Sequence, residues 1–157
     1  MFYPEYHRED TEIHRELNNS QFRMQKAKQI LKEIFGYDSF RPLQQEIIES
    51  IVNKKDCLVV MPTGGGKSLC YQIPALMFNG LTIVISPLIS LMKDQVEQLR
   101  QLGVEAALLN SSLSLKDYNF NFANVKAGKS KLLYLAPESL QKEDISSLLK
   151  SITVDCI

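Results

Sequence analysis

The chain has 157 residues, of which 45% are hydrophobic and 23% are charged. This length suits about one domain, and the composition excludes a disordered or fibrous chain. Basic and acidic residues number 18 each, so the formal net charge is +0 and the chain is not a generally basic nucleic-acid coat. A local patch of Lys and Arg would still be enough to contact phosphates.

The cysteines and the N-terminus indicate the compartment. Cys57, Cys70 and Cys156 contain no C-x-x-C pair and cannot form a closed disulfide framework, so we expect small buried thiols in a reducing compartment. The first ten residues are acidic where a signal peptide is basic and apolar, and no apolar run approaches the roughly 18 residues of a membrane span. We therefore expect a cytoplasmic protein without a membrane partner.

The first part of the chain predicts two helices. Residues 1–23 are polar and are interpreted as a tail or a loose helix, in which His7 and His14 are interpreted as solvated. From about residue 24 apolar residues recur with the helical period up to Phe35, and Gly36 is a candidate C-cap. A second helix is expected to begin near Pro42 and to bury the following set: Leu43, Ile47, Ile48 and Ile51.

After residue 56 the pattern alternates between strand and helix. Short apolar runs predict strands at 57–61, 81–86, 105–109, 131–136 and 152–157. Helices are expected at 67–78, with Pro74 inside, at 88–102 and, less clearly, at 110–128, where Ser114 and Gly128 favour helix over strand. Pro137 opens a turn or short helix. Apolar strands separated by helices predict an α/β fold with a parallel sheet.

One short segment carries the chemistry. Residues 61–68 follow a predicted strand, precede a predicted helix and read Met61, Pro62, Thr63, Gly64, Gly65, Gly66, Lys67 and Ser68. Glycines let backbone N–H groups approach phosphate oxygens, and the helix N-terminus adds its dipole. In such a loop Lys67 would reach the β- and γ-phosphates and the Ser68 hydroxyl would bind Mg²⁺. Met61 stands where the general pattern has Gly, which leaves the turn intact.

Four segments in order resemble motifs of the RecQ family of ATP-dependent DNA helicases, a superfamily 2 family. Residues 61–72 resemble its motif I, 35–44 its motif 0, 86–95 its motif Ia and 133–138 its motif Ib. The resemblance covers residues 24–157. It implies an α/β, RecA-like P-loop motor domain whose parallel sheet is truncated here.

The resemblance also implies roles for single residues. Tyr37 would stack on adenine, Arg41 and Gln44 would read its edge, and the loop would hold the phosphates with Mg²⁺. The implied DNA-binding residues are Ser86, Pro87, Leu88, Lys93, Ala136, Pro137 and Glu138. The implied activity is ATP-driven 3′→5′ movement on single-stranded and partly duplex DNA in repair or recombination, near the nucleoid in a bacterium.

The chain departs from the family at its end. The D-E-A-H box is expected beyond Ile157, and Asp155 is not its Asp because Cys156 follows. We therefore expect residues 24–157 to be an incomplete first motor domain, inactive and poorly soluble alone. One alternative is a naturally truncated nucleotide- or DNA-binding module. Another is a P-loop enzyme such as a small-molecule kinase, against which the Tyr37, Arg41 and Gln44 cluster argues. The oligomeric state stays open.

Overall fold

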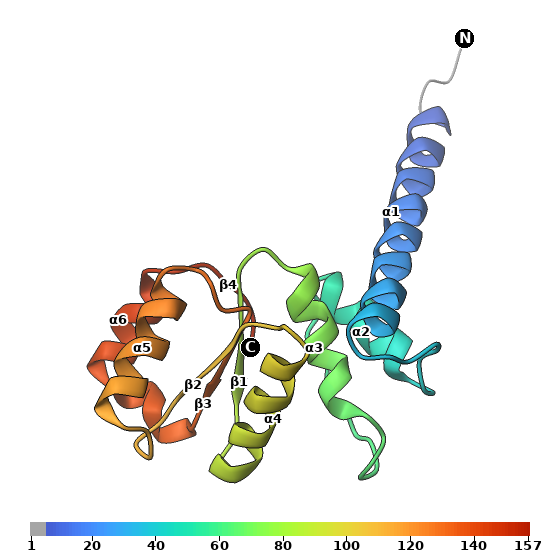
Figure 1. Ribbon diagram of the computed structural model, residues 1–157. Coiled ribbons are helices and arrows are strands. Elements are labelled where there is room, and N and C mark those ends of the chain that lie inside the picture. Colours follow the sequence, from blue (N-terminus) through green and yellow to red (C-terminus); the bar gives the residue numbers. More distant parts are fainter. Residues whose placement is uncertain (1–5) are drawn as a thin grey trace. The chain divides into compact units, whose positions relative to one another are not determined.

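A computed structural model describes residues 6–157, with side chains from residue 19 onward. The chain divides into two compact units, Met1–Ile73 and Pro74–Ile157. The first contains α1 (Tyr6–Glu33), α2 (Gln44–Val52) and most of α3 (Lys67–Met77) (Figure 1). The second continues with β1 (Leu81–Ile85), α4 (Ile89–Gln101), β2 (Ala106–Leu109), α5 (Leu115–Lys126), β3 (Leu132–Leu135), the 3₁₀ helix η1 (Pro137–Gln141), α6 (Glu143–Lys150) and β4 (Val154–Cys156). None of the described helices combines the length and apolar character needed to cross a membrane.

Helix α1 is longer than the periodicity predicts, because it begins at Tyr6 and continues to Glu33. Its side chains bind α2: the Ser20 hydroxyl donates to Glu49 Oε1 at 2.6 Å, and Arg23 donates to Asn53 Oδ1 at 2.6 Å. Gly36 adopts a φ of +74°, as expected of a residue that follows a helix end. His7 and His14 lie outside the residues whose side chains are described.

The second predicted helix begins later than expected. Helix α2 starts at Gln44 and buries Gln44, Ile48 and Val52. Leu43, which was expected in the core, is exposed and has a φ of +70°, a conformation that non-glycine residues rarely adopt. Pro42 and Leu43 therefore form a turn ahead of the helix, because Leu43 cannot continue a right-handed helix from this conformation.

The strand predicted at 57–61 is wrong. This segment has no regular secondary structure and joins no strand among the described residues, and Leu58 and Val60 are 96% and 86% exposed. The sheet of the described residues contains four strands in the order β2-β3-β1-β4. An apolar run becomes a strand only when a neighbouring strand supplies hydrogen-bond partners. The sequence pattern shows the apolar run but does not show whether such a neighbouring strand is present.

The other predicted strands form a parallel sheet, so the expected α/β architecture is confirmed. Ile85 and Leu109 both lie in register with Leu135, so β1, β2 and β3 end at the same edge. Helices α5 and α6 lie on one side of this sheet and α4 on the other (Figure 1). The core on the α5 and α6 side consists of Leu81, Ile83, Ala107, Leu109, Val125, Leu133, Leu135, Ile145 and Leu148.

The ambiguous region 110–128 contains a helix, as Ser114 and Gly128 predicted. Ser114 caps α5, since its hydroxyl accepts the Asp117 backbone N–H at 3.1 Å. The aromatic residues of this helix do not share one environment: Tyr118 and Phe122 pack against the core, whereas Phe120 is 64% exposed. Helix α6 was not predicted, although it buries Ile145 and Leu148 on one face.

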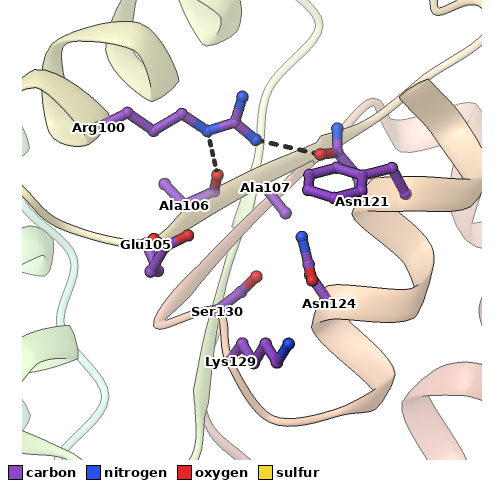
Figure 2. A pocket seen from close by; sticks show the side chains of 9 residues that line it. Arg100, Glu105, Ala106, Ala107, Asn121, Asn124, Lys129 and Ser130 are labelled. Atoms are coloured by element: carbon purple, nitrogen blue, oxygen red, sulfur yellow. Dashed lines mark hydrogen bonds between the residues drawn. The ribbon is translucent and has the colours of Figure 1, made fainter.

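Side chains protect the outer edge of β2, which among the described residues pairs with β3 alone. Arg100 Nε donates to the Ala106 carbonyl at 2.9 Å, and Asn121 Nδ2 donates to the Leu108 carbonyl at 2.9 Å. Arg100 also donates to Asn121 Oδ1 at 3.1 Å, so the two side chains bridge α4 and α5 across the strand (Figure 2). An unpaired edge strand is a template for association, and this bridge occupies two of its acceptors.

Candidate functional site

The loop that connects residue 61 to α3 has the shape of a phosphate cradle. Gly64 and Gly66 adopt φ values of +81° and +80°, which glycine tolerates and other residues resist. A Cβ at Gly65 would lie 3.0 Å from the Pro62 carbonyl oxygen. Helix α3 begins directly after Gly66, so its first amides have no helical carbonyl ahead of them to bond. Each feature suits an anion placed against the backbone.

Two side chains, one from the turn before α2 and one from its first residue, hold this loop. Gln44 is almost completely buried; its Nε2 donates to the Gly66 carbonyl at 3.0 Å and its Oε1 accepts the Arg41 backbone N–H at 2.8 Å. The Arg41 guanidinium donates to the Gly64 carbonyl. A Cβ at Gly66 would overlap the Gln44 amide, so Gly66 is required both by its φ and by its neighbour. Sequence reasoning paired Arg41 and Gln44 with a base and missed these contacts with the loop.

Lys67 lies at the first position of α3 and donates to two loop carbonyls. Its Nζ is 2.8 Å from the Met61 oxygen and 3.0 Å from the Pro62 oxygen. The ammonium is exposed. Lys67 follows the loop in the sequence, whereas Arg41 and Gln44 precede it, so the loop is held by residues from both of its flanks. Ser68 follows it in the first turn of α3. A loop with two left-handed glycines, a lysine and a hydroxyl at a helix N-terminus fits a nucleoside triphosphate with Mg²⁺.

For the metal, the loop offers the Ser68 hydroxyl. The described residues contain no group of three or more His, Cys, Asp or Glu side chains that could hold a metal ion. Oxygen ligands from a hydroxyl, phosphates and water are what Mg²⁺ accepts, so the absence of an acidic cluster in residues 6–157 does not conflict with this chemistry. When bound, Mg²⁺ would neutralise phosphate charge.

Tyr37 follows the end of α1. Its backbone N–H donates to the Leu31 carbonyl at 3.2 Å, and its side chain is 50% exposed. Part of the ring is therefore accessible for stacking in the same unit as the loop.

The cysteines differ from the expectation of three buried thiols. Cys70 is buried on α3, and burial raises the pKa of its thiol, so it stays protonated and unreactive. Cys57 is exposed and Cys156 is half-buried. Cys57 is exposed because it precedes the unpaired segment 58–61.

The residues expected to contact DNA lie at the carboxyl edge of the sheet in the second unit. The Ser86 N–H donates to the Leu135 carbonyl at 3.0 Å, which places Ser86 beside Ala136. The Ser86 hydroxyl accepts the Leu88 N–H at 3.2 Å, and α4 follows without a side-chain cap. Lys93 is exposed on α4. The edge of the sheet is where open parallel folds bind ligands.

The 136–138 segment has mixed exposure. Ala136 is buried, whereas Pro137 and Glu138 are exposed at the start of η1, and Ala136 precedes that helix without a side-chain cap. Ala136 can therefore offer only its backbone to a partner.

Asp155 has a structural contact. Its Oδ2 accepts the Gly80 N–H at 2.6 Å, and a Cβ at Gly80 would lie 2.7 Å from the Thr153 carbonyl oxygen. Because Gly80 precedes β1, Asp155 joins β4 to the beginning of β1, away from the edge where β1 ends.

The comparisons with known proteins agree with this geometry. The model of the DEAD/DEAH box helicase family matches residues 41–155. The chain belongs to this family. Within it, the chain is similar to proteins named ATP-dependent DNA helicase RecQ, so the resemblance read from the four motifs is confirmed. A RecA-like α/β domain is the fold that this helicase family and the parallel sheet support.

Three relatives illustrate the similarity. The RecQ helicase of Haemophilus influenzae is 54% identical over 123 residues, which cover 78% of this chain and 20% of that protein. The Pasteurella multocida RecQ helicase is 49% identical over 85% of this chain and 21% of that protein. The Bacillus subtilis RecQ helicase is 45% identical over 85% of this chain and 23% of that protein. The chain thus spans about a fifth of the length of these helicases.

Proposed function

We propose that the protein carrying this chain is an ATP-dependent DNA helicase of the RecQ type, and that this chain supplies its nucleotide-binding loop. The observation that carries the proposal is the loop Gly64–Ser68, held by Arg41 and Gln44. The helicase family match supports it, together with the similarity to proteins named ATP-dependent DNA helicase RecQ.

The loop residues would divide the work of binding MgATP. Backbone amides of the glycine turn and of the first turn of α3 would bind phosphate oxygens. The Lys67 ammonium would leave the Met61 and Pro62 carbonyls and donate to the β- and γ-phosphates instead. The Ser68 hydroxyl would bind Mg²⁺. Tyr37 would stack on adenine, with Arg41 and Gln44 beside its edge. Such residues position and neutralise the phosphates, which is most of what a protein contributes to phosphoryl transfer.

DNA would lie along the carboxyl edge of the sheet. We propose that backbone amides and the Ser86 hydroxyl, followed by Pro87, Leu88 and Lys93, contact one strand, and that Ala136, Pro137 and Glu138 form a second contact segment. The uncapped start of α4 supports this, since helix N-terminal amides bind phosphates. We further propose single-stranded or partly duplex DNA as substrate, 3′→5′ polarity and a role in repair or recombination at the chromosome.

The test is ATP turnover and strand separation by the protein that carries this chain, with and without single-stranded DNA. We expect DNA to stimulate turnover and Lys67→Ala to abolish it while the protein remains folded by circular dichroism. Lys129→Ala is the matched control, since Lys129 is an exposed lysine outside this loop. ATP binding without turnover would identify a binding module, and turnover that ignores DNA would favour another P-loop enzyme.

A further inference from the structure

Two charged side chains hold the short connection between α3 and β1. The Lys131 ammonium, directly before β3, donates to the Phe78 carbonyl at 2.9 Å and to the Asn79 carbonyl at 3.4 Å. From β4, Asp155 Oδ2 accepts the Gly80 N–H at 2.6 Å. Because β1 lies between β3 and β4 in the sheet, the connection 78–80 is bound by a cation from one neighbouring strand and by an anion from the other.

Helix α3 is weakly stabilised near its C-terminal end. Pro74 lies inside the helix and has no N–H, so the regular helical bond to the Cys70 carbonyl is missing. The last turn of α3 also contains no basic residue, although a cation there would bind the terminal carbonyls and complement the helix dipole. Lys131 supplies this cation from 53 positions away in the sequence, and its contact with Phe78 is part-buried.

Backbone contacts fix the rest of the connection to the same two strands. The Leu81 N–H donates to the Thr153 carbonyl at 2.9 Å, and the Thr82 N–H donates to the Lys131 carbonyl at 3.0 Å. A Cβ at Gly80 would lie 2.7 Å from the Thr153 oxygen, so the chain passes close to β4. A shift of this end of α3 therefore has to break the Lys131 contact, since the residues that follow are already held by the sheet.

The other end of α3 carries the proposed phosphate site. Lys67 and Ser68 form its first turn, directly after the glycine loop. The helix has 11 residues, so its two ends lie only about 16 Å apart. Chemistry of this kind depends on exact placement, and a misplacement of about 1 Å that arises far from the reacting atoms can lower a rate about a hundredfold.

We propose that Lys131 is a positioning residue for the nucleotide: by holding the C-terminal end of α3, it sets the place of the first turn against the phosphates. The inference rests on the proposed ATP-binding function and adds a residue that touches no nucleotide. Because one helix joins the two ends, the linkage is reciprocal, and nucleotide binding must in turn stabilise the connection 78–80.

The experiment is titration of the protein that carries this chain with a fluorescent, non-hydrolysable ATP analogue. Lys131→Met keeps much of the side-chain length but removes the ammonium. We expect the dissociation constant of the analogue to rise about fivefold, the lower end of the usual coupling between two linked sites. Partial unfolding alone would reduce the number of sites titrated and leave the dissociation constant of the folded molecules unchanged.

Two further variants serve as controls. In Lys131→Arg a guanidinium can donate to the same two carbonyls, so this variant should bind the analogue within about twofold of the unaltered protein. Lys129→Met makes the same substitution at an exposed lysine two positions earlier, and it should leave the dissociation constant unchanged.

The outcomes separate this inference from the proposed function. If the unaltered protein binds the analogue and folded Lys131→Met binds it equally well, the inference is overturned and the helicase proposal stands. If the unaltered protein binds no ATP analogue, both are overturned. Should Lys131→Met fail to fold, hydrogen exchange of the unaltered protein decides. Slower exchange of the peptide that contains Gly80 on adding the analogue supports the linkage, and unchanged exchange rejects it.

Discussion

The Gln44 side-chain amide lies 3.0 Å from the Gly66 carbonyl and joins the first residue of α2 to the loop before α3. The two residues are 22 positions apart, and the bond is part-buried. Replacing the amide by a carboxylate in Gln44→Glu removes the donor and sets two acceptors against each other. We expect a loss of about 1–3 kcal/mol in the free energy of unfolding, together with weaker binding of an ATP analogue.

Urea unfolding and analogue titration of the same samples would measure both effects. Gln45→Glu is the control, because Gln45 is the exposed neighbour of Gln44 on α2. Wild-type stability in Gln44→Glu would show that the bond contributes nothing to the loop.

The two left-handed glycines of the loop should respond differently to alanine. At Gly64 a Cβ meets open space, so Gly64→Ala carries only the cost of a positive φ, about 1–2 kcal/mol. At Gly66 the Cβ also overlaps Gln44, so Gly66→Ala must displace a buried side chain. We expect Gly66→Ala to lower the melting temperature and the nucleotide affinity further than Gly64→Ala. Equal effects of the two substitutions would contradict the role of Gln44 as the neighbour that requires glycine.

The hydrogen bond between Tyr118 and Asp144 predicts alkaline behaviour. The Tyr118 hydroxyl donates to Asp144 Oδ2 at 2.7 Å, and burial, followed by the hydrogen bond and charge of Asp144, raises the pKa of Tyr118 to about 12 from an ordinary 10.0. The folded protein therefore keeps this proton at pH values where the unfolded chain loses it. The stabilisation is fully present below pH 10 and is lost as the pH rises through about 12.

We expect Tyr118→Phe to lose about 0.5–1 kcal/mol at neutral pH, since the bond is partly exposed to solvent. Above pH 10 its stability should fall less steeply than that of the wild type. Urea unfolding at pH values on both sides of 10 would measure the two slopes, and parallel slopes would rule out this source of alkaline sensitivity. Tyr37→Phe serves as a comparison for the general effect of removing a tyrosine hydroxyl, since Tyr37 is half-exposed.

Arg100 is expected to keep the β2 edge from pairing with other chains. Arg100→Met keeps much of the side-chain length but releases the Ala106 carbonyl and Asn121 Oδ1. We expect a stability loss of about 1 kcal/mol and concentration-dependent association through the free edge. Sedimentation velocity over a concentration series would detect the association. Lys129 lines the same pocket as Arg100 and Ala106. Lys129→Met removes this cation without releasing either acceptor, and it should remain unassociated.

The sequence predicted most elements of the second unit, because short apolar runs between turn residues leave few alternatives. It failed where a partner decides the structure. Residues 58–60 have the composition of a strand but no strand to pair with, and Phe120 shares a helix with core residues yet faces solvent. Helix α6 was not predicted, because its eight residues are too few to show a clear helical period of apolar residues.

The same distinction holds for the site. The Gly-Gly-Gly-Lys-Ser run predicts its own turn, since the conformation is local. The contacts of Arg41 and Gln44 with Gly64 and Gly66 depend on how α2 packs in the first unit, and no spacing rule encodes them.

The Lys67 ammonium, held by the Met61 and Pro62 carbonyls, changes how phosphate binding should be understood thermodynamically. Binding is an exchange of acceptors, so the measured affinity reports the difference between a phosphate and two carbonyl oxygens rather than the full attraction of an ammonium for a phosphate. Charge on the incoming group then matters more than its shape. A triphosphate should displace the carbonyls readily, whereas a neutral phosphate mimic of the same size should leave Lys67 where it is.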